Sequence, residues 1–233
     1  MLIHKGALIV SCQARADNPL HGPIFMSAMA RAVNAGGAAG FRANGAEDVA
    51  AIRAISTHPI IGIDKIWDDR FPVYITPHFA SAARIAQAGA DIVGVDATRR
   101  PRDGDDVDRL IGRIRHELHR EVFADVSSVA EGLFAHAAGA TYVATTLAGY
   151  TAETAAQMSS GPDLDLLSAL VAAIDGPVVA EGRFDTPDLV AEAFRRGAHA
   201  VVVGTAITNP LEITRKFALA AAPWAEDPRP DAS

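Results

Sequence analysis

The sequence contains one cysteine and no long run of apolar residues. Cys12 is the only cysteine among 233 residues, which excludes a disulfide framework and is typical of a protein from a reducing cytosol. No apolar run is long enough to cross a bilayer, and the first residues lack the apolar core and the cleavage pattern of a signal peptide. We therefore expect a cytoplasmic protein that does not enter a membrane.

The chain also lacks a block rich in lysine and arginine. Its formal net charge is −7, with 21 basic and 28 acidic residues, so nucleic acid is not an expected partner. The composition, 49% apolar and 21% charged, is that of a folded globular protein, and a chain of this length needs no metal staple for stability. Small anionic metabolites remain candidate ligands because they need only one local positive pocket.

One sequence pattern recurs four times along the chain. A helical segment ends at a glycine suited to the position after a helix, and a short apolar strand follows, in residues 34–43, 86–97, 136–146 and 194–205. Further apolar runs occupy residues 7–12, 59–63, 121–126 and 177–182. About eight strands alternating with helices predict an α/β fold, a single-domain TIM (β/α)8 barrel over residues 1–224. The Pro-rich polar residues 225–233 predict a frayed tail.

A doubly wound open sheet is the alternative for this pattern of elements. The strand runs are apolar on successive residues, as expected wherever both faces of a sheet are covered. An open sheet usually carries a glycine-rich turn for a phosphate or dinucleotide after its first strand, and "IVSCQARADNP" has no such signature. The barrel is therefore favoured.

Polar residues follow the predicted strands, where a barrel places its chemistry. They are, in chain order, Gln13, Arg42, Lys65, Asp96, Asp125, Thr145, Thr146, Glu181, Arg183, Gly204 and Thr205. Any one of them alone is more often a solvated loop residue or a helix cap than a catalyst. Asp125 precedes two serines that are better helix caps, which leaves its carboxylate free to face the barrel mouth. Asp96 is instead expected to pair with Arg99 or Arg100.

The loops after the seventh and eighth strands commonly bind phosphate in such barrels. Here Gly182 and Gly204 allow close approach of the backbone to an anion, and Arg183 supplies positive charge. In the competing interpretation both glycines only turn the chain. Glu181 lies at the strand end itself, where burial raises a carboxyl pKa and a neighbouring arginine lowers it. The sequence does not choose between these two effects.

Segments along most of the chain resemble one enzyme family. "GALIVSCQA", "GFRANG", "PIIGIDK", "AGADIVGVDATRRPR", "VVAEGRFDTPD" and "GAHAVVVGTAIT", in this order, resemble the bacterial N-acetylmannosamine-6-phosphate 2-epimerases from about Gly6 to Phe217. The resemblance implies a TIM barrel, a homodimer, and interconversion of N-acetylmannosamine 6-phosphate and N-acetylglucosamine 6-phosphate in sialic acid breakdown. We expect an amino-sugar phosphate substrate, no cofactor and no metal.

The resemblance also implies roles for individual residues. Lys65 and Glu181 match the family's catalytic lysine and glutamate. The sugar-contacting positions fall on Gln13, Arg42, Asp125 and Arg183, and phosphate is held near Gly182, Gly204 and Thr205. Where many members have an arginine that helps to clamp the phosphate, this chain has Asn209. Trp67 and Phe71 stand where more polar residues are expected, and packing is the simplest interpretation of both.

The chemistry of a C2 epimerisation can be compared with these residues independently. A proton must leave the carbon next to the C1 carbonyl of the opened sugar and return to the opposite face. Lys65 serves as the base only if burial or a neighbouring cation lowers its pKa from about 10.4, and Arg42 is such a cation. Glu181 would assist ring opening or protonation, unless a hydroxyl of the sugar itself returns the proton.

Other functions fit the same residues. Lys65 could form a Schiff base, as in a carbon–carbon lyase, and Asp96, Asp125 and Glu181 could hold Mg²⁺. A noncatalytic sugar-phosphate-binding protein is a third alternative. Cys12 is interpreted as a core residue rather than a nucleophile. An apolar helix over residues 211–224 would close the barrel floor or form a dimer interface.

Overall fold

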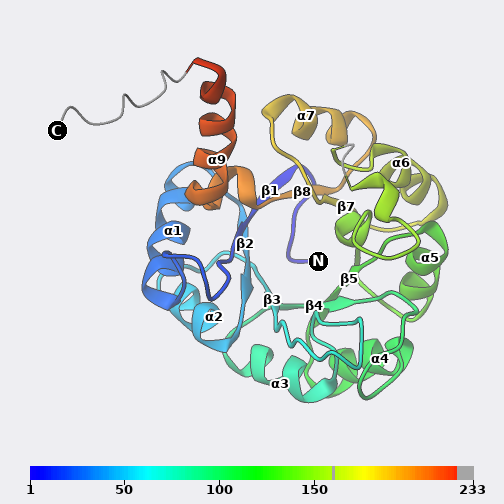
Figure 1. Cartoon of the computed structure of the whole chain (residues 1–233). Helices are drawn as coiled ribbons and strands as arrows, with labels where there is room; N and C mark the ends of the chain where they lie inside the picture. The colour runs from blue at the N-terminus through cyan, green and yellow to red at the C-terminus, as the bar shows by residue number, and fades with distance from the viewer. Residues whose placement is uncertain (159–160, 225–233) are drawn as a thin grey trace.

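The computed structural model describes residues 1–158 and 161–224, and its strands close into a parallel barrel surrounded by helices (Figure 1). The strands are β1 (Ala7–Cys12), β2 (Gly40–Asn44), β3 (Ile60–Ile63), β4 (Ile92–Asp96), β5 (Glu121–Asp125), β6 (Tyr142–Ala144), β7 (Val178–Glu181) and β8 (Ala200–Val203). The helices are α1 (Pro23–Ala35), α2 (Ala46–Arg53), α3 (Phe79–Gln87), α4 (Val107–Glu117), α5 (Val129–Ala137), α6 (Leu164–Ala173), α7 (Pro187–Arg195), α8 (Thr205–Thr208) and α9 (Pro210–Ala221).

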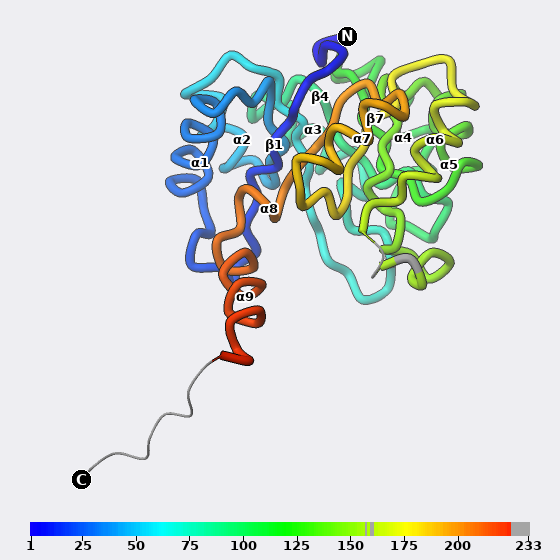
Figure 2. The backbone as a smooth tube through the Cα atoms, turned by 90° about the horizontal axis from the view of Figure 1, so that it is seen from above, coloured from blue at the N-terminus to red at the C-terminus, as the bar shows by residue number. Residues whose placement is uncertain are grey.

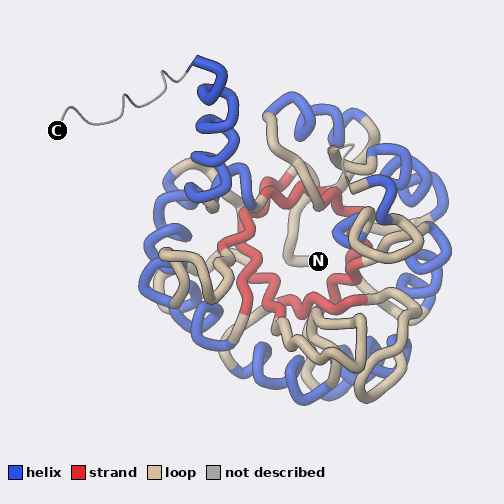
Figure 3. Tube along the Cα trace, viewed as in Figure 1, coloured by secondary structure: helices blue, strands red, loops and turns tan. Residues whose placement is uncertain are grey.

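The closure of the sheet decides between the two predicted folds. β1 pairs with β8 as well as with β2, so the sheet has no edge and the TIM barrel prediction is confirmed. Figure 3 shows the strands as an inner ring and the helices as an outer one. The open sheet is therefore wrong for this chain, and the predicted tail at residues 225–233 lies outside the described residues.

Alternate residues of each strand face the inside of the barrel. Ile9, Ile61, Phe123, Val179 and others form one buried cluster in the interior. Their neighbours along the strands pack instead against the surrounding helices. Both faces of the sheet are thus covered, which is why the strand sequences are apolar on successive residues. The same alternation points the residues at the strand ends into the mouth of the barrel.

The amino-terminal segment closes the end of the barrel opposite the mouth (Figure 2). Ile3 is buried there, and the hydroxyl of Tyr142 accepts hydrogen bonds from the backbone N–H groups of Leu2 and Ile3, both at 3.0 Å. A ring nitrogen of His199 lies 2.9 Å from the carbonyl oxygen of Ile3. These contacts connect the first residues to β6 and to the turn before β8.

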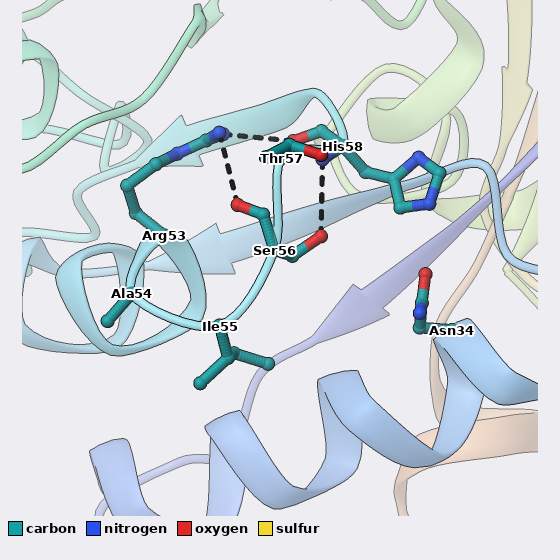
Figure 4. Close-up of a pocket in the computed structure, with 7 residues that line it drawn as sticks. All are labelled: Asn34, Arg53, Ala54, Ile55, Ser56, Thr57 and His58. Atoms are coloured by element: carbon teal, nitrogen blue, oxygen red, sulfur yellow. Dashed lines mark hydrogen bonds between the residues drawn. The ribbon is translucent and has the colours of Figure 1, made fainter.

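A shallow hollow at the same end is lined by Asn34 and residues 53–58 (Figure 4). Arg53 donates hydrogen bonds there to the carbonyl oxygens of Ser56 and His58, at 3.3 and 2.9 Å, and forms an ion pair with Asp91. The Arg53 guanidinium is therefore already paired with groups of the protein. This hollow lies away from the strand ends that carry the candidate site.

Helix α9 projects away from the barrel at the mouth end (Figures 1 and 2). None of its described residues, Pro210–Ala221, is buried. The prediction that this segment closes the barrel floor is therefore wrong, because residues 1–6 do so, and an interface with a second copy stays a prediction. Within residues 1–158 and 161–224, no helix is long and apolar enough to cross a membrane.

Candidate active site

Four of the predicted site residues converge at the mouth because they continue the inward-facing rows of the strands. Arg42 lies within β2, Asp125 ends β5 and Glu181 ends β7, while Lys65 follows β3 by two residues. Phe123 lies two positions before Asp125 and points into the barrel interior, and the Arg42 guanidinium lies 5.2 Å from the centroid of its ring. The site therefore rests directly on the apolar interior of the barrel.

The guanidinium of Arg42 is shared between two carboxylates. Its Nη1 and Nη2 donate to Oδ1 and Oδ2 of Asp125 at 2.8 and 2.7 Å, which is bidentate geometry. Nη1 also donates to Oε2 of Glu181 at 2.6 Å. The side chains of Arg42 and Asp125 are 2% and 0% exposed, and that of Glu181 is 13% exposed. Because these charges are removed from water, each depends on its partner.

Lys65 is held at the start of a hairpin that rises from β3. Its backbone N–H donates to Oδ1 of Asn44 at 2.9 Å, and it pairs with Ile75 in an antiparallel bridge. Burial, as the largest cause, and the positive charge of Arg42 together lower the pKa of the Lys65 amine to about 8, against the opposing charges of Glu181 and Asp125. The predicted influence of Arg42 on this lysine is thus present in the structure, second to burial.

Glu181 has the opposite shift. Burial raises its pKa to about 7, with Asp125 adding to the rise and Arg42 opposing it. The Thr146 hydroxyl donates to its Oε2 at 3.2 Å, and the Thr145 hydroxyl contacts its backbone carbonyl oxygen and N–H at 2.9 and 3.1 Å. The turn after β6 therefore positions both the side chain and the backbone of Glu181.

Thr146, expected only at the end of a strand, joins the site through its hydrogen bond to Glu181. The signal that identifies it is the period of two along β6. Tyr142 and Ala144 belong to the interior cluster, and Thr146 continues their row into the mouth.

Asp96 is a structural residue. Its carboxylate accepts from Nη2 of Arg100 at 2.7 Å and from the backbone and hydroxyl of Thr98 at 2.9 and 2.6 Å. The predicted pairing with Arg100 is confirmed. All three carboxylates of the magnesium hypothesis are thus bound to arginines, and the described residues contain no group of three side chains of histidine, cysteine, aspartate or glutamate that could hold a metal ion.

The two glycines of the β7 and β8 loops occupy constrained positions. Gly182 has a φ of 108°, a conformation that side chains rarely adopt. A Cβ on Gly204 would lie 3.3 Å from Cβ of Ser11, so the backbone approaches β1 closely. Thr205 is exposed and begins α8, directly after Gly204. This geometry leaves backbone groups of both loops near the mouth, and phosphate binding by them stays a prediction.

Arg183 has contacts that the sequence did not predict. Its Nε and Nη1 donate to the carbonyl oxygens of Gly161 and Ala148 at 2.5 and 2.6 Å, and its backbone φ is 59°. The guanidinium therefore joins the two ends of the loop after β6. Its predicted contact with the substrate is not tested by these interactions, because the remaining N–H groups of the guanidinium are not used in them.

The β1 loop and the start of α9 complete the rim. Nε2 of Gln13 donates to Oγ of Ser11 at 2.7 Å, while its Oε1 is buried without a hydrogen-bond partner among the described residues. Oδ1 of Asn209 accepts from the backbone N–H of Glu212 and from Nδ2 of Asn18, both at 3.3 Å. Asn209 thus caps α9 and ties it to the β1 loop.

Cys12 is fully buried, and burial raises the pKa of its thiol to about 12. A thiol in this state is a poor nucleophile at neutral pH, so its interpretation as a core residue is confirmed.

Comparisons with known proteins identify the family of the chain. A family model described as "Putative N-acetylmannosamine-6-phosphate epimerase" (NanE) matches residues 26–222. Two curated proteins named "Putative N-acetylmannosamine-6-phosphate 2-epimerase" are similar to the chain. The protein from Cutibacterium acnes is 48% identical over 215 residues, 91% of this chain and 92% of that protein. The protein from an Enterobacter species is 44% identical over 218 residues, 93% of each chain.

Solved structures give the same result. The N-acetylmannosamine-6-phosphate 2-epimerase from Clostridium perfringens superposes with a TM-score of 0.89 at 40% identity, over 94% of both chains. A thiamine phosphate pyrophosphorylase from Pyrococcus furiosus has a TM-score of 0.63 at 17% identity, a likeness that concerns the fold alone. The extent and identity of the sequence matches establish that this chain belongs to the N-acetylmannosamine-6-phosphate epimerase family.

Proposed function

We propose that this protein epimerises C2 of N-acetylmannosamine 6-phosphate, giving N-acetylglucosamine 6-phosphate. The observation that carries the proposal is the pair formed by Lys65 and Glu181. Burial moves their pKa values toward each other, to about 8 and about 7, and both groups sense the charges of Arg42 and Asp125. A base and an acid whose pKa values lie near neutrality are what proton transfer at carbon requires.

The reaction begins from the opened sugar. The neutral amine of Lys65 takes the proton from C2, and the electrons of the C–H bond form a C1–C2 double bond while those of the C1 carbonyl move to its oxygen, giving an enolate whose C2 carries the acetamido group. The protonated carboxyl of Glu181 then returns a proton to the opposite face of C2, and the C1 carbonyl forms again. Lys65 ends as an ammonium and Glu181 as a carboxylate. The reverse reaction uses the same groups with their roles exchanged.

The charges around the two groups support this exchange. Transferring one proton between Lys65 and Glu181 leaves their combined charge at zero, so Arg42 and Asp125 see no change in total charge. Because burial brings the two pKa values close together, at about 8 and about 7, the ionised pair and the neutral pair lie near each other in free energy. The neutral pair that the reaction needs is therefore accessible near neutral pH.

The phosphate group belongs, in this proposal, at the β7 and β8 loops. Gly182, Gly204 and Thr205 offer backbone groups and a hydroxyl there, and Arg183 adds positive charge. Gln13, with its unpartnered Oε1, contacts a hydroxyl of the sugar. The C6 end of the substrate then points to β7 and β8, and C2 lies between the two acid–base groups.

The test is exchange of the C2 hydrogen with solvent deuterium, followed by proton NMR. Wild-type protein should exchange the C2 hydrogen of both sugar phosphates, and Lys65→Ala should abolish this exchange. Lys5→Ala is the matched control, because Lys5 is an exposed lysine at the opposite end of the barrel. Undiminished exchange in Lys65→Ala would remove Lys65 from the role of base.

A lysine with a lowered pKa also suits Schiff-base chemistry. Borohydride treatment in the presence of the substrate separates the two reactions, because it reduces an imine on Lys65 to a stable adduct. We expect no increase in protein mass. An adduct mapped to Lys65 would support the lyase instead.

A homodimer in the cytoplasm is the working state that we propose for the protein. Helix α9 carries Phe217 and Leu219, which are 73% and 75% exposed, on an element that has no buried residue among those described. Covering such side chains with a second copy removes apolar surface from water. The buried thiol of Cys12 is compatible with a reducing compartment.

A further inference from the structure

A short hairpin stands beside the catalytic lysine. Residues 64–76 fold back on themselves through the bridge between Lys65 and Ile75, a second bridge between Asp68 and Phe71, and the hydrogen bond from the Ile66 N–H to the Tyr74 carbonyl oxygen at 2.9 Å. Each end of the segment is therefore fixed to the other.

Two further contacts anchor the hairpin to the barrel mouth. Ile75 forms a buried cluster with Ile63 of β3 and Leu147 of the turn after β6, and Tyr74 packs against this cluster. The Asp96 N–H donates to the carbonyl oxygen of Ile75 at 3.0 Å. The hairpin thus forms part of the wall of the site.

An aromatic pair lies on this wall. The rings of Trp67 and Tyr74 are stacked with 4.0 Å between centroids and 16° between planes. One face of the indole is covered by Tyr74, yet Trp67 remains 66% exposed, so its other face is open. Burial raises the pKa of the Tyr74 phenol, and the charges of Asp125 and Asp96 raise it further, so the phenol lies near the carboxylates of the mouth. An indole held in this way is a preorganised apolar surface.

We propose that the stacked pair of Trp67 and Tyr74 is the subsite for the N-acyl group of the substrate. This inference rests on the proposed function. The phosphate at C6 points to β7 and β8, so the group attached to C2 projects to the opposite side, where the hairpin carries Lys65. The methyl of an acetamido group contacts the indole, and an enzyme without this surface would bind the acylated sugar more weakly. The residue that looked out of place in the sequence is then a specificity determinant.

Fluorescence gives a direct test, because Trp67 and Trp224 are the only tryptophans in the sequence. In the variant Trp224→Phe, Trp67 is the sole reporter, and Trp224 lies after α9 with 86% of its surface exposed. Titration with N-acetylmannosamine 6-phosphate should give a saturable change in emission. Mannose 6-phosphate, which has a hydroxyl at C2, and inorganic phosphate should give none at concentrations that inhibit turnover.

Steady-state kinetics provide the second readout. Trp67→Ala should raise KM for N-acetylmannosamine 6-phosphate by ~2- to 10-fold, as expected for loss of one aromatic contact, with kcat within twofold of wild type. Trp67→Phe should restore most of the affinity. Trp224→Phe should match wild type, and circular dichroism checks that each variant is folded.

The fluorescence and turnover experiments can contradict the proposed subsite in three ways. A chain that turns over the sugar phosphate without any change in Trp67 emission overturns the subsite and leaves the proposed function intact. An equal response to inorganic phosphate places Trp67 at the other end of the substrate and also overturns it. If wild-type protein neither binds nor turns over the acylated sugar phosphate, the proposed function and the subsite fall together.

Discussion

Nη1 of Arg42 lies 2.6 Å from Oε2 of Glu181, and yet the pKa of Glu181 is raised to about 7. A direct ion pair alone would lower it. Burial disfavours the Glu181 carboxylate most strongly, and Asp125, which holds the same guanidinium with both of its oxygens, opposes the ionisation of Glu181 further through its negative charge. One cation shared by two buried carboxylates thus leaves the second carboxylate ready to hold a proton.

The pH dependence of kcat/KM should be bell-shaped with a maximum between pH 7 and 8. In the productive state Lys65 is neutral and Glu181 is protonated. The pKa of Lys65 is about 8 and that of Glu181 is about 7. Below this range Lys65 is charged, and above it Glu181 has lost its proton. Initial rates in both directions between pH 5.5 and 9.5 measure the profile. A rate that is flat across the whole range would contradict this pairing.

Replacement of Asp125 by asparagine should move the pH optimum to lower values. The Asp125 charge raises the pKa of Glu181 and also that of Lys65, so its loss lowers both. The variant should be destabilised by ~3 kcal/mol, since one partner of a buried ion pair is gone. Rates measured against pH and denaturant unfolding check the two effects. Asp165→Asn, at a fully exposed position, is the control and should alter neither.

Thr146→Val should move the optimum in the opposite direction. The hydrogen bond from Thr146 favours the carboxylate of Glu181, so its removal raises the pKa of Glu181 above about 7. Thr146→Ser keeps the donor and should restore the profile. Thr141→Val, at the floor of the barrel, should leave it unchanged. An unaltered optimum in Thr146→Val would show that the hydrogen bond does not tune Glu181.

Loss of the Arg183 side chain should loosen the turn after β6. Its guanidinium holds the carbonyl oxygens of Ala148 and Gly161, and the Ala148 N–H closes the turn on Thr145. Amide hydrogen exchange of peptides covering residues 142–150 should be several-fold faster in Arg183→Ala. Arg195→Ala removes a surface arginine paired with Glu192 and should leave this exchange as in the wild type.

Charged residues on α9 should separate the proposed dimer. We expect wild-type protein to sediment as a dimer, and Phe217→Asp combined with Leu219→Asp to sediment as a monomer, because a charge in an apolar interface is costly. Leu133→Asp on α5, where the leucine is 44% exposed, is the control and should leave the dimer intact. A wild-type monomer at micromolar concentration would remove the proposal.

The sequence allowed the barrel and the centre of the site to be predicted because both depend on local patterns. Glycine at helix ends and apolar runs mark each unit, and Arg42, Asp125 and Glu181 stand where those runs end. Contacts between distant segments could not be predicted in this way. The link of Arg183 to Ala148 and Gly161 depends on the conformation of a long loop.

Helix α9 shows the limit of periodicity in another respect. Its apolar residues indicate that one face must be covered, but their spacing does not identify what covers it. Ile3 and its neighbours close the barrel floor, and a helical pattern cannot predict this because these residues are not helical. Likewise Trp67 could be recognised as unusual from the sequence, whereas its stacking on Tyr74 depends on the hairpin bringing them together.

The closure of the barrel floor has a consequence for synthesis on the ribosome. Ile3 precedes β1, whereas its contacts on Tyr142 and His199 come from β6 and from the turn before β8, so the ribosome makes Ile3 long before its partners. A nascent chain halted before the turn that precedes β8 therefore lacks the last strand. It also lacks His199, one of the residues that hold Ile3 at the barrel floor. Its interior apolar side chains stay open to solvent until β8 pairs with β1, so incomplete forms of the chain should bind chaperones.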